Sequence, residues 1–265
     1  MKTNMKINSF TVIGLGKVGK IFTHIFKNNL NFKLDYIVDK KENGSFSGVD
    51  ILNDIPEKID SDLIIISTPD DNILSIINLL NSEHIIKKDV IFLHFSGALY
   101  IKGNNVVSIH PMMSITNYEN DLKRLKEHYF TLQSDSPELI DIFKPVLSVI
   151  TKNYMIIEGD DKKYFHLSAV MINNFSTALV NSSAEVMKRA GLSEKEALDI
   201  LLPLFKDVFV NLSNNQDIRA SLTGPVVRND NKTIEKHIKL LESHKMTDEE
   251  FIYNSFLSYM KKLLQ

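Results

Sequence analysis

The sequence contains no cysteine, and this absence excludes several chemistries at once. Disulfides, thiolate nucleophiles and zinc sites built on sulfur all need a thiol, so none of them is available to this chain. Arginine is scarce as well, with only Arg124, Arg189, Arg219 and Arg228, and the formal net charge is −2. A chain without an excess of basic residues is a poor candidate for binding nucleic acid, so we expect no nucleic-acid partner.

Long hydrophobic runs are also missing. No apolar stretch approaches the roughly 18–20 residues that a membrane span requires, and residues 1–7 show neither the apolar core nor the cleavage site of a signal peptide. We therefore expect a cytoplasmic protein with no membrane partner. What the chain does have is 43% hydrophobic and 24% charged residues over 265 positions, which is enough for one large or two modest globular domains.

Residues 1–158 alternate between short β-rich runs and helical runs. The expected strands are Ile7–Ile13, Lys33–Asp39, Asp62–Thr68, Asp89–His94, Asn105–Ile109, Tyr129–Gln133 and Tyr154–Ile157. The expected helices are Lys17–Asn29, Asn72–Leu80 and Pro137–Ile150. Apolar strands separated by helices are typical of a parallel sheet covered on both faces. We therefore predict an α/β domain of the Rossmann type for residues 1–158.

Residues 159–265 show no convincing strand and are predicted to form an all-α domain for substrate binding and dimerisation. The expected helices are Asp161–Ala190, Glu194–Ser213, Lys232–Ser243 and Asp248–Leu263. Gly191 is expected to end the first helix, and Ser193 with Glu196 to begin the second as a capping box. A helix of about 30 residues is about 45 Å long, which is longer than a small domain needs. We therefore expect a homodimer formed through these helices.

A glycine-rich turn follows the first expected strand and opens the first helix. It contains Gly14, Gly16 and Gly19 in the spacing G-x-G-x-x-G, which permits a tight turn, close approach of a pyrophosphate, and packing of the helix on the strand. The helix N-terminus then faces the phosphates. We expect a dinucleotide to contact Gly14, Leu15, Gly16, Lys17, Val18 and Gly19. The alternative is a tight turn with no ligand.

Asp39 ends the second strand 20 residues after Gly19, where a ribose-binding acid belongs. A carboxylate there favours the free 2′-hydroxyl of NAD and repels the 2′-phosphate of NADP. Lys40 and Lys41 follow at once and could neutralise such a phosphate, although lysines are also ordinary in a surface turn. The sequence predicts NAD or NADP, with NAD slightly favoured, and Asp39 and Lys40 as cofactor contacts.

Ligands of open α/β sheets bind beyond the carboxyl ends of the strands, and three expected strands end in polar residues. Ser67 and Thr68 are expected to contact the cofactor, and Ser96 to face the nicotinamide. His110 is the leading catalytic candidate, because an imidazole can give or take the proton that accompanies hydride transfer near neutral pH. The alternative for His110 is a structural histidine bonded to backbone.

Polar residues of the helical part complete the expected site. His166 and Asn174 lie about two turns apart on an otherwise apolar helix, so they share one face, and would be costly if buried without partners. They are expected either to pair with backbone or to line a cleft. The turn that begins at Thr223 ends in Arg228, which could bind an acidic substrate or simply face solvent. No metal site is expected.

Together these motifs resemble a family. The stretches that carry the resemblance are Gly14–Gly19, Ser96–Gly97, Ile109–Pro111, Tyr164–His166 with Asn174, and Leu222–Arg228. They are similar to the Rossmann-like proteins with a C-terminal domain of unknown function, DUF2520, which are often labelled NADP- or F420-dependent oxidoreductases. The resemblance covers almost the whole chain, and it implies a Rossmann domain followed by a helical domain that often forms the dimer.

The wider relatives of that family are β-hydroxyacid dehydrogenases, pyrroline-5-carboxylate reductases and prephenate dehydrogenases. In β-hydroxyacid dehydrogenases a lysine and an asparagine on the first helix after the sheet are catalytic. Here the corresponding lysine is absent and His166 stands in its neighbourhood, so the sequence departs from that mechanism. Prephenate dehydrogenases carry a catalytic histidine in a His-Pro-Met run, and His110–Met112 is similar, although the Phe-Gly pair that follows in that family is missing.

Two classes of function fit these observations. The first is an NAD(P)-dependent oxidoreductase that transfers hydride between a nicotinamide cofactor and a small anionic metabolite. His110 would then act as acid or base, and Ser96, His166, Asn174, Thr223 and Arg228 would hold the substrate; a prephenate-dehydrogenase-like enzyme is a variant of this class. The second is a dinucleotide-binding sensor or scaffold without turnover.

Overall fold

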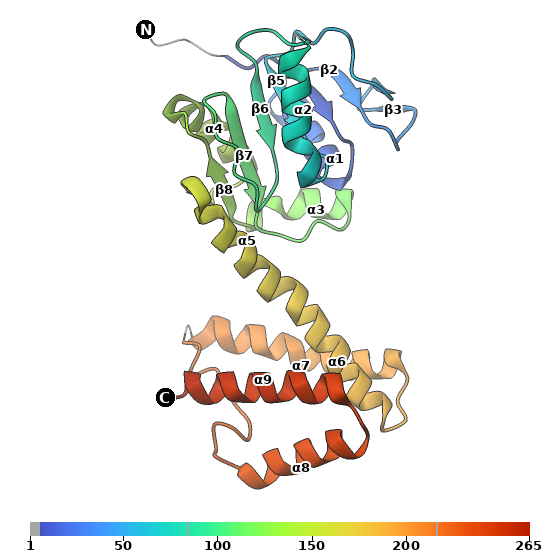
Figure 1. Cartoon of the computed structure of the whole chain (residues 1–265), viewed down its shortest axis with the longest axis vertical. Coiled ribbons are helices and arrows are strands. Elements are labelled where there is room, and N and C mark those ends of the chain that lie inside the picture. Colours follow the sequence, from blue (N-terminus) through green and yellow to red (C-terminus); the bar gives the residue numbers. More distant parts are fainter. Residues whose placement is uncertain (1–5, 84, 216) are drawn as a thin grey trace. The chain divides into compact units, whose positions relative to one another are not determined.

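The computed structural model describes residues 6–83, 85–215 and 217–265. The chain forms two compact units, one ending at Val170 and one beginning at Met171, which are described separately (Figure 1). This division falls later than the boundary predicted at 158/159, which marks only the change from strands to helices. The first turns of the helix that follows belong to the first unit because Lys162 bonds there to Leu99 and Ser108.

The first unit is built on one sheet of nine strands in the order β3-β4-β2-β1-β5-β6-β7-β8-β9. The strands are β1 Ser9–Ile13, β2 Lys33–Val38, β3 Ser45–Phe46, β4 Val49–Leu52, β5 Leu63–Ile66, β6 Ile91–His94, β7 Val106–Pro111, β8 Phe130–Gln133 and β9 Tyr154–Ile156. The run from β4 to β7 is parallel, and β1 lies where the order of the chain reverses. Such a reversal is where α/β sheets bind ligands.

One prediction about the sheet is wrong. The strand expected at Tyr129–Gln133 was assigned to a parallel sheet, yet β8 runs antiparallel to β7, with His110 opposite Thr131. The chain returns through α3 (Tyr118–Arg124) and the short 3-10 helix η2 (Leu125–Glu127), which the sequence pattern did not predict and which turn it back along β7. The edge pair of β3 and β4 is antiparallel too, and it was also missed.

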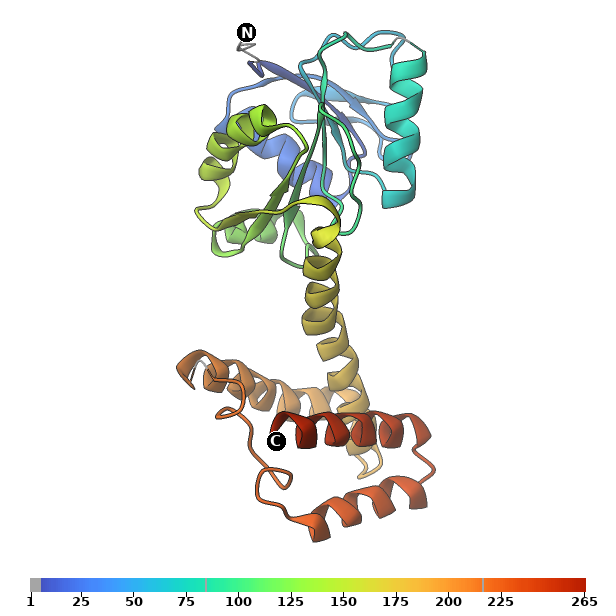
Figure 2. The ribbon, with the colours of Figure 1, turned by 60° about the vertical axis from the view of Figure 1, so that its left-hand side comes forward.

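Helices cover both faces of the sheet, as Figure 2 shows from the side. Each face of the sheet has its own hydrophobic core, and the larger one includes Phe10, Phe22 and Phe130. On the face with this larger core lie α1 (Lys17–His24), the π-helix η1 (Ile25–Asn29) and α4 (Pro137–Ile150). On the other face, α2 (Asp70–Ser82) buries Ile73, Ile77 and Leu80 against the smaller core. The predicted Rossmann-type α/β fold, followed by an all-α part, is confirmed.

The second unit contains only helices and turns among its described residues. The long helix after the sheet begins in the first unit with a 3-10 turn η3 (Gly159–Asp161) and α5 (Lys162–Val170). It continues in the second unit as a π-helical turn η4 (Met171–Phe175) and α6 (Ser176–Lys188). The later helices are α7 (Glu194–Asn215), α8 (Asn231–Ser243) and α9 (Thr247–Leu263). The predicted capping box is confirmed, because Ser193 and Glu196 exchange hydrogen bonds at 2.8 and 3.3 Å.

In the part of the chain that the structure describes, no helix has the length and apolar character needed to cross a lipid bilayer.

Candidate functional site

The loop after β1 carries three glycines, and each has a different structural reason. Gly14 has a φ of +94°, and a Cβ there would lie 2.8 Å from the backbone of Ser67. Gly19 packs so tightly that a Cβ would collide with the carbonyl oxygen of Gly14. Gly16 is different, because nothing lies within 4 Å of the place its Cβ would take. There is therefore no room for a side chain at Gly14 and Gly19, whereas the space beside Gly16 is free.

Gly16 is also the N-cap residue of α1, and no side chain of a described residue caps that helix end. The first N–H groups of a helix have no partner within the helix, and they attract anions. The other loop side chains are placed by packing: Leu15 is buried in the larger core, Val18 packs against it, and Lys17 is exposed. Leu15 and Val18 can therefore offer a ligand only their backbone.

Asp39 lies directly after β2, with its carboxylate turned toward the glycine loop. It accepts the backbone N–H of Leu15 at 2.6 Å, and those of Lys41 and Glu42 at 2.7 and 3.0 Å. Burial raises the pKa of this carboxyl, but the three N–H donors together outweigh it and leave the pKa below its usual value. The acid is therefore ionised and fixed beside the loop, while Lys40 is exposed and makes no side-chain bond to it among the described residues.

The two hydroxyls that follow β5 have different environments. The Ser67 hydroxyl donates to the carbonyl oxygen of Gly14 at 2.5 Å, so it holds the glycine loop. Thr68 has a buried hydroxyl that finds no hydrogen-bond partner among the described residues. A buried hydroxyl without a partner is costly, which makes Thr68 the better of the two candidates for a ligand contact.

Ser96 follows β6, and its hydroxyl is already occupied. It donates to the Asp70 carboxylate at 2.5 Å and accepts the N–H groups of Ala98 and Leu99 at 3.3 and 2.9 Å. These bonds tie the loop after β6 to the start of α2. The expected contact of Ser96 with the nicotinamide stays a prediction, and the geometry gives the residue a second task in shaping this loop.

His110 and His166 converge over Gly97. Their rings are 5.9 Å apart and meet edge to face. A Cβ on Gly97 would lie 2.8 Å from Nε2 of His110 and would collide with Nδ1 of His166. That Nδ1 atom is buried and has no partner among the described residues. The structure thus brings both predicted histidines together over a residue that has room for them only because it is glycine.

The tautomer of His110 follows from its hydrogen bond. Nδ1 lies 2.9 Å from the carbonyl oxygen of Phe95, which can only accept, so Nδ1 carries the proton and Nε2 has the lone pair. Burial lowers the pKa of His110 to about 4; the Phe95 carbonyl and Asp70 oppose this shift, while the charges of Lys162 and His166 add to it. The ring is therefore neutral at pH 7, with the lone pair on Nε2.

The sequence interpretation gave no role to His94 and Lys162, and it named Gly97 only as part of the family resemblance. His94 lies at the end of β6 and is 1% exposed, and burial lowers its pKa to about 3. Lys162 is the only buried lysine among the described residues, and Gly97 spaces the two histidine rings. A polar side chain that ends an apolar strand was the available signal for His94; no local pattern marks Lys162 as buried.

The remaining predicted residues lie in the second unit. Asn174 is exposed, and its side-chain oxygen accepts from Asn173 at 2.9 Å. Arg228 is exposed as well, and Thr223 lies on the wall of a cavity. Their expected role in binding substrate stays a prediction. No group of three or more metal-binding side chains occurs among the residues whose positions are described.

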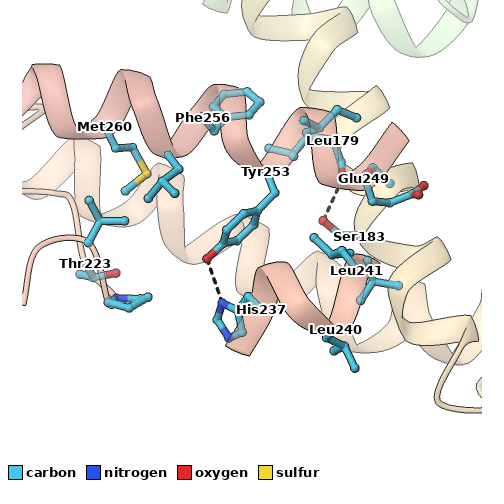
Figure 3. Close-up of a pocket in the computed structure, with 16 residues that line it drawn as sticks. Leu179, Ser183, Thr223, His237, Leu240, Leu241, Glu249, Tyr253, Phe256 and Met260 are labelled. Atoms are coloured by element: carbon cyan, nitrogen blue, oxygen red, sulfur yellow. Dashed lines mark hydrogen bonds between the residues drawn. The ribbon is translucent and has the colours of Figure 1, made fainter. Parts of the chain in front are cut away.

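That cavity has a volume of about 560 Å³ and lies between α6, α8, α9 and the turn at Thr223 (Figure 3). Its walls are mostly apolar, with Leu179 and Phe256 among them. The polar exceptions include His237, whose Nδ1 lies 2.9 Å from the hydroxyl of Tyr253. The second unit therefore has an apolar pocket that is open to solvent.

Comparison with solved structures gives the same fold over nearly the whole chain. Protein TM1727 of Thermotoga maritima is 25% identical, with a TM-score of 0.72 over 96% of this chain and 98% of that one. BF3122 of Bacteroides fragilis, provisionally described as an NADP oxidoreductase, is 18% identical, with a TM-score of 0.74 over 98% and 100%. A pyrroline carboxylate reductase of Plasmodium falciparum with NADP bound is 14% identical, with a TM-score of 0.57 over 98% and 99%.

A search by sequence against curated proteins finds no match. Comparison with protein families does find one, to the domain of unknown function DUF2520, over residues 128–258. The match spans β8, α4, β9 and most of the helical part, and it includes the Tyr164–His166 and Leu222–Arg228 stretches on which the resemblance was based. Residues 128–258 are therefore similar to DUF2520, and they follow the first strands of a Rossmann-type sheet.

Proposed function

We propose that this protein is an NAD(P)-dependent oxidoreductase that transfers hydride between a nicotinamide cofactor and a small anionic metabolite. The observation that carries the proposal is the loop after β1. It is open at Gly16, it presents uncapped N–H groups of α1, and it holds the ionised Asp39 beside it. Phosphates at a helix N-terminus and an acid for the ribose are what dinucleotide binding requires.

The second support is the pair of histidines over Gly97. A bound nicotinamide ring would supply the hydride donor or acceptor, and a proton must move at the substrate in the same reaction. His110 is neutral with a lone pair on Nε2, so it can accept the proton of a hydroxyl or amine as the substrate is oxidised. His166, whose Nδ1 has no hydrogen-bond partner within the described part of the chain, can hold a polar group of the substrate.

The choice between NAD and NADP rests on two observations that point in opposite directions. Asp39 is ionised and is bonded by N–H donors, which favours the 2′-hydroxyl of NAD. The Plasmodium reductase of the same fold holds NADP, which favours the phosphorylated cofactor. We propose nicotinamide dinucleotides as the cofactor class, and the binding experiment below measures both.

The proposal also includes a homodimer formed through the second unit, in the cytoplasm. Support for the dimer comes from α7, where Ile200, Leu204, Val208 and Phe209 are all exposed. Contiguous exposed apolar side chains mark interaction surfaces. Arg228, Thr223 and Asn174 are proposed to hold an acidic group of the substrate.

The test is cofactor binding followed by turnover. Gly16→Asp places a carboxylate where the pyrophosphate would approach, so we expect the affinity for NADH and NADPH to fall at least tenfold. Ser75→Asp adds the same charge on the exposed surface of α2 and is the matched control. Fluorescence titration measures both variants. Equal affinity in the parent and Gly16→Asp would show that the loop does not bind a dinucleotide.

A panel of hydroxy acids, oxo acids and cyclic imines then separates an enzyme from a sensor. With a substrate found, His110→Ala is expected to lower kcat by roughly 10²–10⁴, the range for general acid–base catalysis. His166→Ala is expected chiefly to raise KM, as the loss of uniform binding does. Tight dinucleotide binding without turnover of any member of the panel would favour the sensor.

A further inference from the structure

The helix that follows the sheet, α5, begins with a lysine that is 1% exposed. Nζ of Lys162 donates to the carbonyl oxygen of Leu99 at 3.2 Å and to the hydroxyl of Ser108. Within the described part of the chain, it forms no ion pair with a carboxylate; Asp70 acts on it only from a distance. An amine in this position is held by neutral oxygen atoms alone.

Such a group is costly to bury. Burial lowers the pKa of Lys162 to about 7, and the charge of Asp70 opposes that shift only in part. A side chain that served merely to fill this space would be better as methionine or leucine, because an apolar residue carries no desolvation cost. The amine therefore calls for an explanation other than packing.

Both hydrogen-bond acceptors of Lys162 belong to segments that position His110. Ser108 lies two residues before His110 on β7, so the two side chains point to the same face of the sheet. Leu99 belongs to the loop after β6, and the first residue of that loop, Phe95, accepts the Nδ1 proton of His110. Lys162 is thus hydrogen-bonded to the strand that carries His110 and to the loop that fixes the tautomer of His110.

The amine also acts on the ring through its charge. Its positive charge lowers the pKa of His94 and that of His110. The other ionisable groups that face this cluster are Asp70 at the start of α2 and His166 on α5. Among these ionisable groups Asp70 favours a charged imidazole, as does the Phe95 carbonyl, whereas Lys162 and His166 oppose it. A proton on Lys162 and a proton on His110 therefore exclude one another in part.

We propose that Lys162 is a positioning residue for His110, which it holds in place through Ser108 and Leu99 and from which it repels a second proton. This role rests on the proposed function, in which His110 must offer a bare Nε2 to the substrate. When Lys162 gains or loses its own proton, the proton affinity of His110 changes with it. The protonation of Lys162 and that of His110 are then coupled.

The experiment is a titration of the full-length chain by NMR, with ¹³C-labelled histidine and lysine and no cofactor or substrate. His110→Gln assigns the His110 signal. In Lys162→Met, which keeps the length of the side chain and removes the charge, we expect the pKa of His110 to shift upward. In the control Ser108→Ala the amine keeps its charge, so the pKa of His110 is expected to remain low. An unchanged His110 titration in Lys162→Met would overturn the proposal.

The parent chain gives a second measurement that needs no variant. The Lys162 Cε signal is expected to titrate near pH 7, with a concurrent step in the His110 ring signals. A Lys162 signal that titrates near the ordinary lysine value would overturn the proposal even if Lys162→Met failed to fold. Dinucleotide affinity is expected to be equal in the parent and Lys162→Met, since neither the glycine loop nor Asp39 bonds to Lys162. A parent chain that binds no dinucleotide would reject the proposed function. The coupling of Lys162 and His110 would still be decided by the titration.

Discussion

At the scale of single residues, the site is notable for polar groups that are kept uncharged. His94 and His110 both lie at the carboxyl ends of neighbouring strands, and burial is the main cause that lowers the pKa of each. Nδ1 of His94 is buried without a partner among the described residues. Neutral imidazoles in such surroundings make the free energy of unfolding fall in acid, because these histidines bind protons in the unfolded chain at a pH at which they stay neutral in the folded chain.

The pH dependence of folding follows from this difference. The pKa of His94 is about 3 in the folded chain, against about 6.5 for an exposed histidine. The contribution of a neutral His94 to stability is therefore complete above pH 6.5 and is lost as the pH falls from 6.5 toward 3. The loss is about 1.4 kcal/mol per pH unit for one such histidine. Urea denaturation between pH 7.5 and 5 measures it, above the range in which carboxylates titrate.

His94→Leu removes one of the two buried imidazoles and is expected to make this dependence less steep, while the part due to His110 remains. His244→Gln, at an exposed histidine of the second unit, is the matched control. A slope in His94→Leu as steep as that of the parent would contradict the assignment of the acid sensitivity to His94.

At the scale of elements, the loop from Phe95 to Leu99 organises the site. It supplies the carbonyl that fixes His110, the Ser96 hydroxyl that binds Asp70, and the carbonyl that accepts from Lys162. Gly97 lies in its middle and lets the two histidine rings approach. The loop connects β6 and α2 with α5, so a small change in its shape reaches every proposed catalytic group.

Gly97→Ala tests this element. The added Cβ would collide with Nδ1 of His166 and lie 2.8 Å from Nε2 of His110, so the rings must separate. We expect the free energy of unfolding to fall by about 1–3 kcal/mol, as overpacking does, and turnover to fall with it. Gly103→Ala is the control, because a Cβ there would meet its nearest neighbour at an ordinary 3.6 Å. Equal stability of the two variants would mean that the rings do not meet over Gly97.

The same elements show what the sequence could and could not predict. The glycine loop, Asp39 and the capping box at Ser193 are local patterns, in which a few neighbouring residues determine the geometry. The direction of β8, the bond of Ser96 to Asp70 and the burial of Lys162 depend on residues far apart in the chain. In particular, the resemblance to β-hydroxyacid dehydrogenases pointed to His166 and not to Lys162 one turn earlier, because the burial of Lys162 depends on its bonds to the distant Leu99 and Ser108.

At the scale of the whole molecule, the second unit leaves much of its apolar surface uncovered. On α7, Leu204 and Phe209 are 62% and 70% exposed. Monomeric proteins rarely expose contiguous apolar side chains on this scale. Light scattering at micromolar concentration is therefore expected to give a dimer for the parent chain.

Phe209→Glu is expected to weaken that dimer by placing a charge on the apolar surface. Asn211→Glu makes the same change of charge at an exposed polar position of α7 and is the matched control. A monomeric parent would reject dimerisation, and a Phe209→Glu variant that dimerises as well as Asn211→Glu would place the interface elsewhere.

The DUF2520 match begins at residue 128, between β7 and β8, and so it crosses the sheet rather than following either compact unit. A fragment cut at that point would keep β8 and β9 but lose the strand whose residues Ser108–Pro111 pair with β8. The exposed edge would carry unpaired N–H and C=O groups, which recruit other strands and cause aggregation. The matched segment is therefore not a unit of folding, and it has to be produced with the strands that precede it.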